Sequence, residues 1–371
     1  MTDARGFEIF LACPPGLEEA LAQEVRSKAF KQIKPVPGGV TIRGAWPDVW
    51  RANLWLRGAT RVLARIASFR VTHLAQLDDR AHGLDWRAVL RPGVPFRVEA
   101  SCAASKIWHS GAAAERIERA IRDALGTPPS PDAEVTIRAR IDHDLCTISV
   151  DTSGEMLHRR GHKQEVNAAP MRESMAALFL LACGFDGGEP VLDPMCGSGT
   201  FVIEAAEIAA RLNPGRSRRF AFEHLATFDE AAWRKLREAK SRRETPFRFH
   251  GSDRDAGAVA MSRANAERAG VRDLTLFEQR PVGAIVPPDG PPGLVIVNPP
   301  YGTRLGDKGA LLPLYQALGQ ALLTRFRGWR VGLIASEKRL AHATRLPFLE
   351  AGPPVPHGGL RVTLYRTAPL A

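Results

Sequence analysis

The sequence lacks the features of metal-stabilised, disulfide-rich and membrane proteins. Its five cysteines are scattered over 371 residues and form no C-x-x-C pair, so neither a zinc site nor a disulfide framework is expected. No apolar run approaches the ~18 residues of a membrane helix, and no basic-then-apolar leader opens the chain. We therefore expect a cytoplasmic protein with no bound metal and no membrane partner, long enough for two or three domains.

A glycine-rich stretch, DPMCGSGT at residues 193–200, lacks the marks of the common phosphate-binding loops. No lysine precedes Thr200, as a P-loop would require, and Val202 stands where a dinucleotide-binding loop has its third glycine. The apolar segment before the loop and the helical spacing after it predict a strand-to-helix turn, where open α/β sheets bind ligands. The alternative interpretation is an Asp-capped turn whose glycines serve geometry only.

Two carboxylates at predicted strand ends favour a cationic ligand with a ribose. Asp193 would repel a pyrophosphate but suits the ammonium of S-adenosylmethionine, and Gly197 and Gly199 would let the backbone approach the ligand. Asp253 ends the next strand and is interpreted as the ribose ligand, whereas Asp255 is interpreted as a helix N-cap. The predicted cofactor-binding residues are Asp193, Met195, Cys196, Gly197, Gly199, Thr200, Asp253, Arg254, Gln279 and Asn298.

A tetrad, Asn298-Pro299-Pro300-Tyr301, follows a third predicted strand that is apolar on both faces. Its two prolines lack N–H groups and fix φ, so the turn presents carbonyl acceptors, and Tyr301 adds a flat ring. This combination fits a planar exocyclic amine, whose poorly nucleophilic nitrogen needs chiefly in-line positioning. The alternative is an ordinary proline turn with a buried tyrosine. We interpret Asn298, Pro299, Pro300 and Tyr301 as the catalytic residues.

Together these segments resemble the class I S-adenosylmethionine-dependent methyltransferases, and within them the THUMP-domain RNA guanine-N2 methyltransferases of the bacterial large-subunit rRNA branch. LACPPGLEEALAQEV and GGVTIRG resemble the family's ferredoxin-like segment, and the run from Leu157 to Phe185, with Ala169-Pro170 and Glu173, its entry to the first strand. The resemblance implies that Asn298 and the Pro299 carbonyl hold a guanine amine and that Tyr301 stacks on the base. One departure is Gly283, near which the family has an acid for the adenine amine; Glu278, Gln279 or a backbone carbonyl would substitute.

The resemblance implies an α/β fold in which a Rossmann-like methyltransferase domain at 153–371 follows a ferredoxin-like domain at 1–60 and a THUMP RNA-binding domain at 61–152. The formal charge of +11 is concentrated in segments 51–97 and 211–248, which suits a polyanion, although basic segments are often merely solvated. Trp108 is either a stacking residue or a structural anchor.

The implied function is formation of N2-methylguanosine in 23S rRNA, with S-adenosylmethionine as cofactor and RNA as partner. A sister alternative changes only the substrate, to tRNA. A DNA adenine-N6 methylase uses a similar tetrad, but the THUMP-like half argues against it. A non-catalytic RNA-binding module is disfavoured by the complete set of Asp193, Asp253 and the tetrad.

Overall fold

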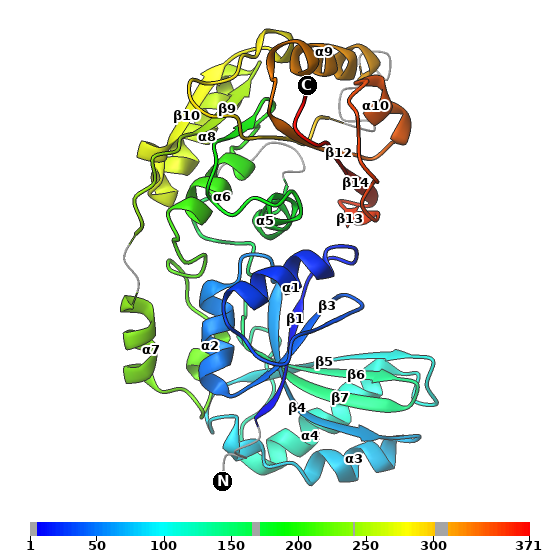
Figure 1. Cartoon of the computed structure of the whole chain (residues 1–371). Helices are drawn as coiled ribbons and strands as arrows, with labels where there is room; N and C mark the ends of the chain where they lie inside the picture. The colour runs from blue at the N-terminus through cyan, green and yellow to red at the C-terminus, as the bar shows by residue number, and fades with distance from the viewer. Residues whose placement is uncertain (1–5, 165–170, 240–241, 301–310) are drawn as a thin grey trace. The chain divides into compact units, whose positions relative to one another are not determined.

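The computed structural model describes residues 6–164, 171–239, 242–300 and 311–371, which form two compact units (Figure 1). Unit 1 comprises Met1–Cys13, Val25–Leu157 and Gly215–Ala239, and unit 2 comprises Pro14–Glu24, His158–Pro214 and Lys240–Ala371. Each unit contains a seven-stranded sheet. The chain therefore leaves and re-enters each unit more than once.

The sheet of unit 1 has the order β2-β3-β1-β4-β7-β6-β5. Its pairs are antiparallel except for β5 with β6. The strands are β1 (Phe7–Ala12), β2 (Lys34–Val36), β3 (Gly39–Gly44), β4 (Arg61–Arg70), β5 (Phe96–Ala103), β6 (Val135–Asp142) and β7 (Leu145–Asp151). A turn at Asp142-His143-Asp144 joins β6 to β7, and His143 and Asp144 adopt positive φ.

The helices that accompany this sheet bury their apolar residues. Ile117, Ile121 and Leu125 of α4 are buried on one face, and Val49 and Leu54 are buried in α2. The helices of the N-terminal part are α1 (Glu18–Ser27), α2 (Trp46–Trp55), α3 (Leu74–His82) and α4 (Ser110–Leu125), with a short 3-10 turn η1 (Trp86–Ala88).

The sheet of unit 2 has the order β10-β9-β8-β11-β12-β14-β13. The strands β10, β9, β8, β11 and β12 are parallel neighbours, and β14 is antiparallel to both β12 and β13. The strands are β8 (Val191–Asp193), β9 (Phe249–Asp253), β10 (Thr275–Gln279), β11 (Leu294–Val297), β12 (Arg330–Ala335), β13 (Val355–His357) and β14 (Leu360–Arg366). Strand order reverses between β8 and β11, and ligands of open α/β sheets bind in the crevice at such a switch point.

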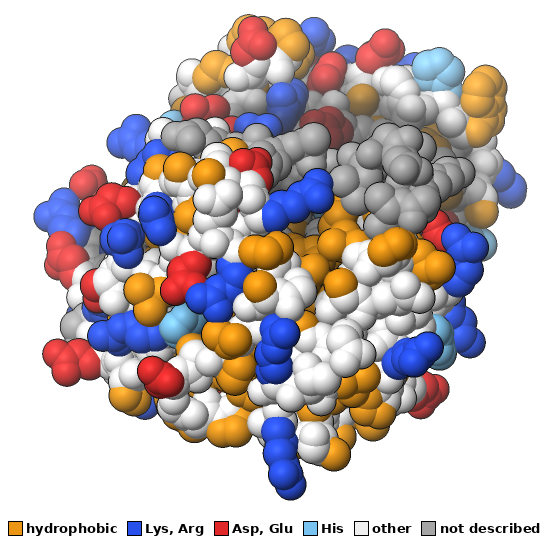
Figure 2. All heavy atoms as spheres, turned by 90° about the horizontal axis from the view of Figure 1, so that it is seen from above, with side chains coloured by type: hydrophobic (Ala, Val, Ile, Leu, Met, Phe, Trp, Pro, Cys, Tyr) orange, Lys and Arg blue, Asp and Glu red, His pale blue; other side chains and the backbone are white. Residues whose placement is uncertain are grey.

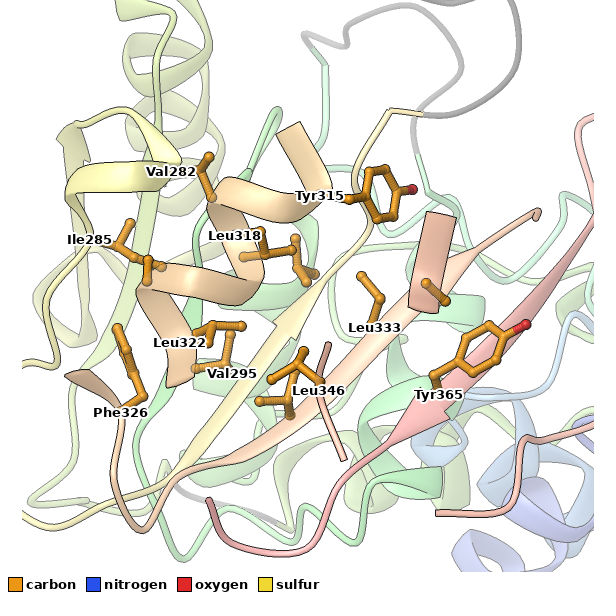
Figure 3. Packing of buried hydrophobic residues seen from close by; sticks show 14 of the residues in the cluster. Val282, Ile285, Val295, Tyr315, Leu318, Leu322, Phe326, Leu333, Leu346 and Tyr365 are labelled. Atoms are coloured by element: carbon orange, nitrogen blue, oxygen red, sulfur yellow. The ribbon is translucent and has the colours of Figure 1, made fainter. Parts of the chain in front are cut away.

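Helices cover both faces of this sheet. On one face, Leu318 and Leu322 of α9 and Phe326, which follows the helix, pack with Val295 of β11 and Leu333 of β12 (Figure 3). The opposite face lies against the end of α5, because a Cβ on Gly332 of β12 would be 2.6 Å from Cys183 Sγ. Burial on both faces explains why β11 is apolar throughout. The helices are α5 (Glu173–Ala182), α6 (Thr200–Ala209), α8 (Ala256–Ala269), α9 (Leu311–Arg325) and α10 (Lys338–Ala343), with 3-10 turns η3 (Arg272–Leu274) and η4 (Val282–Ala284).

The basic segment 211–248 is divided between the two units. Its central part, Gly215–Ala239, contains η2 (Ala221–His224) and α7 (Glu230–Glu238) and belongs to unit 1. The Gly215 N–H donates to Leu54 O (3.1 Å) and the Ala226 N–H to Val89 O (2.9 Å), and Phe222 stacks with Phe220. Within the described ranges no helix is both long and apolar enough to cross a bilayer.

Candidate cofactor and amine site

The glycine-rich loop is a tight turn between β8 and α6. The Cys196 N–H donates to Ser252 O of β9 (2.9 Å), and the Gly199 N–H donates to Cys196 O (2.7 Å). Gly197 and Gly199 have φ of +54° and +80°, which side-chain-bearing residues adopt at a cost of roughly 1–2 kcal/mol. The loop is therefore a rigid cradle whose backbone faces the switch point.

Helix α8 and strand β10 form a wall that packs closely against Gly199 of this loop. A Cβ on Gly199 would lie 3.1 Å from Ser262 Oγ and 3.2 Å from Phe277 Cζ. Ser262 Oγ donates to Gly197 O (2.9 Å), and Asn265 Nδ2 donates to Ser198 O (3.1 Å). Sequence reasoning missed these supporting residues. The signal was present as two polar residues three apart, and therefore on one face, in the alanine-rich α8.

Asp193 is a buried carboxyl with one hydrogen bond from its own loop. It ends β8, has 2% of its surface exposed, and accepts the Met195 N–H at Oδ1 (3.0 Å). Burial raises the pKa of Asp193 to about 8, the nearby Asp253 adds to the rise, and the Met195 hydrogen bond opposes it. A cation placed beside this carboxyl would favour its ionised form, so the residue fits the ammonium predicted there.

Asp253 ends β9 and accepts hydrogen bonds from the glycine-rich loop and from the turn before α8. Its Oδ2 accepts the Gly197 N–H (3.1 Å) and its Oδ1 accepts the Asp255 N–H (3.1 Å). Each carboxylate oxygen can accept a second hydrogen bond, so both ribose hydroxyls can still be bound. Asp255 is the N-cap of α8 and accepts the Gly257 N–H (2.8 Å), as predicted.

Asn298 follows β11 at the same edge of the sheet. In the register, Leu192 of β8 pairs with Val295 of β11, and Asp193 pairs with Gly251 of β9, so the three strands end side by side. Asn298 Oδ1 is buried and has no hydrogen-bond partner in the described part of the chain. Such acceptors are rare because leaving one unpaired costs about 1–3 kcal/mol. A ligand N–H would satisfy it.

The tetrad lies close to α9 at Pro300. Pro299 is buried, and the Tyr315 hydroxyl, itself fully buried, lies 3.5 Å from Pro300 O. Figure 3 shows Tyr315 on α9 above the same core that supports β11. Tyr301, like Ala169 and Pro170, lies outside the described residues, so its predicted stacking role stays a prediction.

The remaining predicted cofactor residues differ in their surroundings. Met195 is partly buried against the α9 core, and Cys196 is buried with Sγ 3.7 Å from Ser262 Oγ. Thr200 is buried at the first position of α6, and Arg254 is exposed. Burial raises the pKa of the Cys196 thiol well above its usual value, so this cysteine is a neutral wall of the loop.

The end of β10 carries the candidates for an adenine contact. Gln279 Nε2 donates to Arg254 O (3.1 Å), and Glu278 pairs with Arg280 (2.8 Å). Gly283, in η4, is bound through its carbonyl by Arg325 (2.9 Å). Gln279, Glu278 and Gly283 thus each bind a neighbouring residue, and the adenine contact stays a prediction. No cluster of three or more metal-ligating side chains occurs among the residues with a described structure.

Two family models and curated relatives match the chain. Residues 160–351 match the family described as "RMKL-like, methyltransferase domain", and residues 8–63 match the "RlmL ferredoxin-like domain". The chain is 36% identical to the ribosomal RNA large subunit methyltransferase K/L of Methylococcus capsulatus over 90% of its own length. It spans about half the length of the curated relatives that it matches, 47% in that case. The predicted methyltransferase fold and the ferredoxin-like segment before it are confirmed.

Solved structures share the fold over almost the whole chain. A possible methylase from Clostridium difficile 630 superposes with a TM-score of 0.90 at 29% identity and covers 99% of both chains. SMU.472, a candidate methyltransferase in complex with SAH, superposes with a TM-score of 0.89 at 27% identity and the same coverage.

Proposed function

The chain belongs to the RMKL-like methyltransferase family, and from this premise we propose that it forms N2-methylguanosine in 23S rRNA with S-adenosylmethionine as methyl donor. The observation that carries the proposal is the buried, unpaired Asn298 oxygen at the switch point, beside the loop that contains Asp193. The rRNA substrate is supported by the large-subunit rRNA methyltransferases that the chain resembles over 90% of its length.

The cofactor residues divide the ligand between the strand ends. Asp193 holds the ammonium, the Gly197–Gly199 backbone lies along the methionine part, and Asp253 accepts the ribose hydroxyls. The related structure with SAH supports this choice of cofactor. S-adenosylmethionine supplies a methyl group on a sulfonium, which needs no metal to make it electrophilic.

The tetrad positions the amine that receives the methyl group. The Asn298 side-chain oxygen and the Pro299 carbonyl each accept one guanine N2–H, which turns the nitrogen lone pair toward the methyl carbon. Tyr301 stacks on the base, and Tyr315 steadies the Pro300 carbonyl from α9. Orientation of this kind can contribute several kcal/mol to the rate without a strongly shifted general base.

We propose that residues 61–152 bind RNA as a THUMP domain, with help from the two basic segments. Many of their arginines have structural partners: Arg61 pairs with Asp151 (2.5 Å), and Arg218 donates to Glu155 O (2.7 Å) and Met156 O (2.9 Å). On the face shown in Figure 2, Lys and Arg side chains lie among Asp and Glu. Arg80 and Arg91 are exposed, so they are better candidates for phosphate contacts than the arginines with structural partners.

The substrate is tested by incubating the full chain with labelled S-adenosylmethionine and protein-free 23S rRNA, tRNA or duplex DNA. Digestion to nucleosides and mass spectrometry should find N2-methylguanosine from 23S rRNA alone. The same nucleoside from tRNA would select the sister substrate. N6-methyladenine from DNA, or no methylation of any substrate, would overturn the proposal.

The role of Asn298 is tested by Asn298→Ala. Asn298 is also among the predicted cofactor-binding residues, but its buried, unpaired oxygen is the acceptor proposed for the amine. Turnover of Asn298→Ala should therefore fall at least a hundredfold, a loss of ~2.7–4 kcal/mol being typical when a transition-state contact is removed. Cofactor affinity, measured by calorimetry, should change less than about threefold. A variant with near-normal turnover would show that another group holds the amine.

A further inference from the structure

The loop between β5 and α4 of unit 1 exposes a tryptophan. Trp108 has 79% of its surface exposed, the largest fraction among the large apolar side chains in the described ranges. The preceding Ile107 is buried, with 4% exposed, so the backbone is anchored while the indole faces solvent. The indole is therefore available to pack its flat face against a partner.

The loop is held in one conformation by the neighbouring β6–β7 turn. Asp144 Oδ1 accepts the Lys106 N–H (2.8 Å), and the Asp144 N–H donates to Ser105 Oγ (3.0 Å), which in turn donates to Ala103 O (2.7 Å). The His143 N–H also donates to Ala103 O (3.2 Å). Trp108 therefore stands on a rigid support, and little conformational entropy is lost when a ligand packs against it.

Hydrogen-bond donors flank the indole on the same loop. The His109 ring lies edge-on to Trp108 with centroids 5.7 Å apart. His109 Nδ1 accepts the Ala112 N–H (2.9 Å), so Nε2 is the ring nitrogen that carries the proton. Lys106 and His109 are both exposed. In the sequence, the cation Lys106 thus precedes Trp108 and the N–H donor His109 follows it.

The adjoining strand ends add two further cations. Arg70 ends β4 and reaches His143 O (3.4 Å), and Arg140 of β6 is exposed beside the same turn. Asp142 pairs with Arg140 (2.9 Å), so these two charges offset each other. Asp144 is oriented by the Lys106 N–H, and Lys106 and Arg70 remain as the cations of this surface. The surface around Trp108 therefore attracts anions more than it repels them.

We propose that the loop 104–109 is a stacking platform for one unpaired base of the RNA. Trp108 takes the base on its face, while Lys106 and His109 contact the phosphates on either side. The exposed Lys106 on the loop and Arg70 at the adjoining strand end favour a polyanion over a protein partner. The proposal rests on the proposed function for the identity of the RNA.

Stacking is separable from phosphate binding with paired probes. Fluorescence anisotropy would compare a labelled oligouridylate of about 12 nucleotides with an abasic ribose-phosphate strand of equal length. The full-length chain should prefer the strand with bases by about tenfold, within the range of base–aromatic stacking. Trp108→Ala should lose this preference and keep its affinity for the abasic strand, and Trp108→Phe should restore part of the preference.

The control is Leu349→Ala, which truncates an apolar side chain exposed to 54% in unit 2 and should leave both affinities unchanged. On 23S rRNA, Trp108→Ala should raise KM without lowering turnover at saturating RNA. A base preference that survives in Trp108→Ala would overturn the proposal, as would an equal loss of affinity for both strands. Unchanged binding to naked RNA with loss of a ribosomal protein contact would assign the tryptophan to a protein partner instead. The strand comparison requires no methyl transfer, so it fails independently of the proposed function.

Discussion

Two residues of the site are held in states that the protein would not favour without a ligand. Asp193 is a carboxyl taken out of water with one hydrogen bond, and Asn298 has a buried oxygen with no partner in the described part of the chain. Both lie at carboxyl ends of central strands, where the rigid sheet fixes them. Such groups lower the stability of the unliganded protein and favour ligand binding, so they identify the site more specifically than its glycines do.

The Asp193 carboxyl makes both stability and cofactor binding depend on pH. Its pKa is about 8 in the folded chain and 3.8 as the ordinary value, so its contribution to the free energy of unfolding is fully present below about pH 4. That contribution is lost progressively as the pH rises from about 4 through about 8, because over this range the carboxyl ionises in the unfolded chain while the buried group still holds its proton. The ammonium of the cofactor favours the ionised form, so binding should release a proton and tighten over the same range.

Asp193→Asn tests both effects. Without cofactor, the variant should melt at the same temperature as the parent or higher, with the difference growing between about pH 5 and pH 8. Its cofactor affinity should be at least tenfold lower, since a hydrogen bond to a charged group contributes ~1.5–3 kcal/mol, and should vary little with pH. Melting curves and calorimetry across that pH range provide the measurement. An unchanged affinity would remove Asp193 from the site.

At the scale of elements, the sequence predicted the strands and helices that have a strong pattern. The β11 segment was recognisable because both faces are buried, and α4 because its apolar residues recur at helical spacing. Strand β13 has only three residues, too few to show alternation, and α7 buries a single residue, Trp233. The loop and strand ends of the site were predictable from local signals. The α8 side of its wall left a weak signal in the spacing of Ser262 and Asn265, whereas Phe277 of β10 left none, because it lies far from the loop in sequence.

The close fit of the glycine-rich loop predicts a large difference between two similar substitutions. Gly199→Ala and Gly270→Ala both place a side chain at positive φ, +80° and +70°, at a cost of roughly 1–2 kcal/mol. Only at Gly199 would the new Cβ meet the α8 wall, since nothing lies within 4 Å of a Cβ on Gly270. Gly199→Ala should therefore unfold at lower denaturant and lose cofactor affinity at least tenfold, whereas Gly270→Ala should retain full affinity. Equal effects of the two changes would show that the wall is not what excludes side chains.

At the scale of the whole molecule, the sequence suggested successive domains, whereas the compact units are interleaved along the chain. Segment Gly215–Ala239 lies between two stretches of unit 2 yet packs within unit 1. Trp50 of α2 contacts Phe222 with centroids 6.2 Å apart, and Trp233 contacts the same ring at 4.9 Å. The Phe222 N–H also donates to Thr152 O (3.1 Å). A cut at residue 153 therefore divides the core of unit 1.

Fragments 1–152 and 153–371 should consequently depend on each other. Fragment 153–371 alone should expose Phe220, Phe222 and Trp233, bind a hydrophobic dye and aggregate. Co-expression with fragment 1–152 should yield a stable complex that copurifies through a tag on either fragment, and Phe222→Asp in the longer fragment should prevent it. A well-behaved monomeric 153–371 fragment that ignores its partner would contradict this expectation.

The interleaving also dictates an order of events during synthesis. Residues 25–157 leave the ribosome early, but the aromatic side of α2 is covered only once Gly215–Ala239 has followed. At roughly 5–20 residues per second, synthesis of the intervening residues leaves Trp50 uncovered for on the order of ten seconds. During that time the nascent unit 1 exposes apolar surface that would later be buried. Its yield in a cell should therefore depend on the elongation rate and on chaperones that bind this surface.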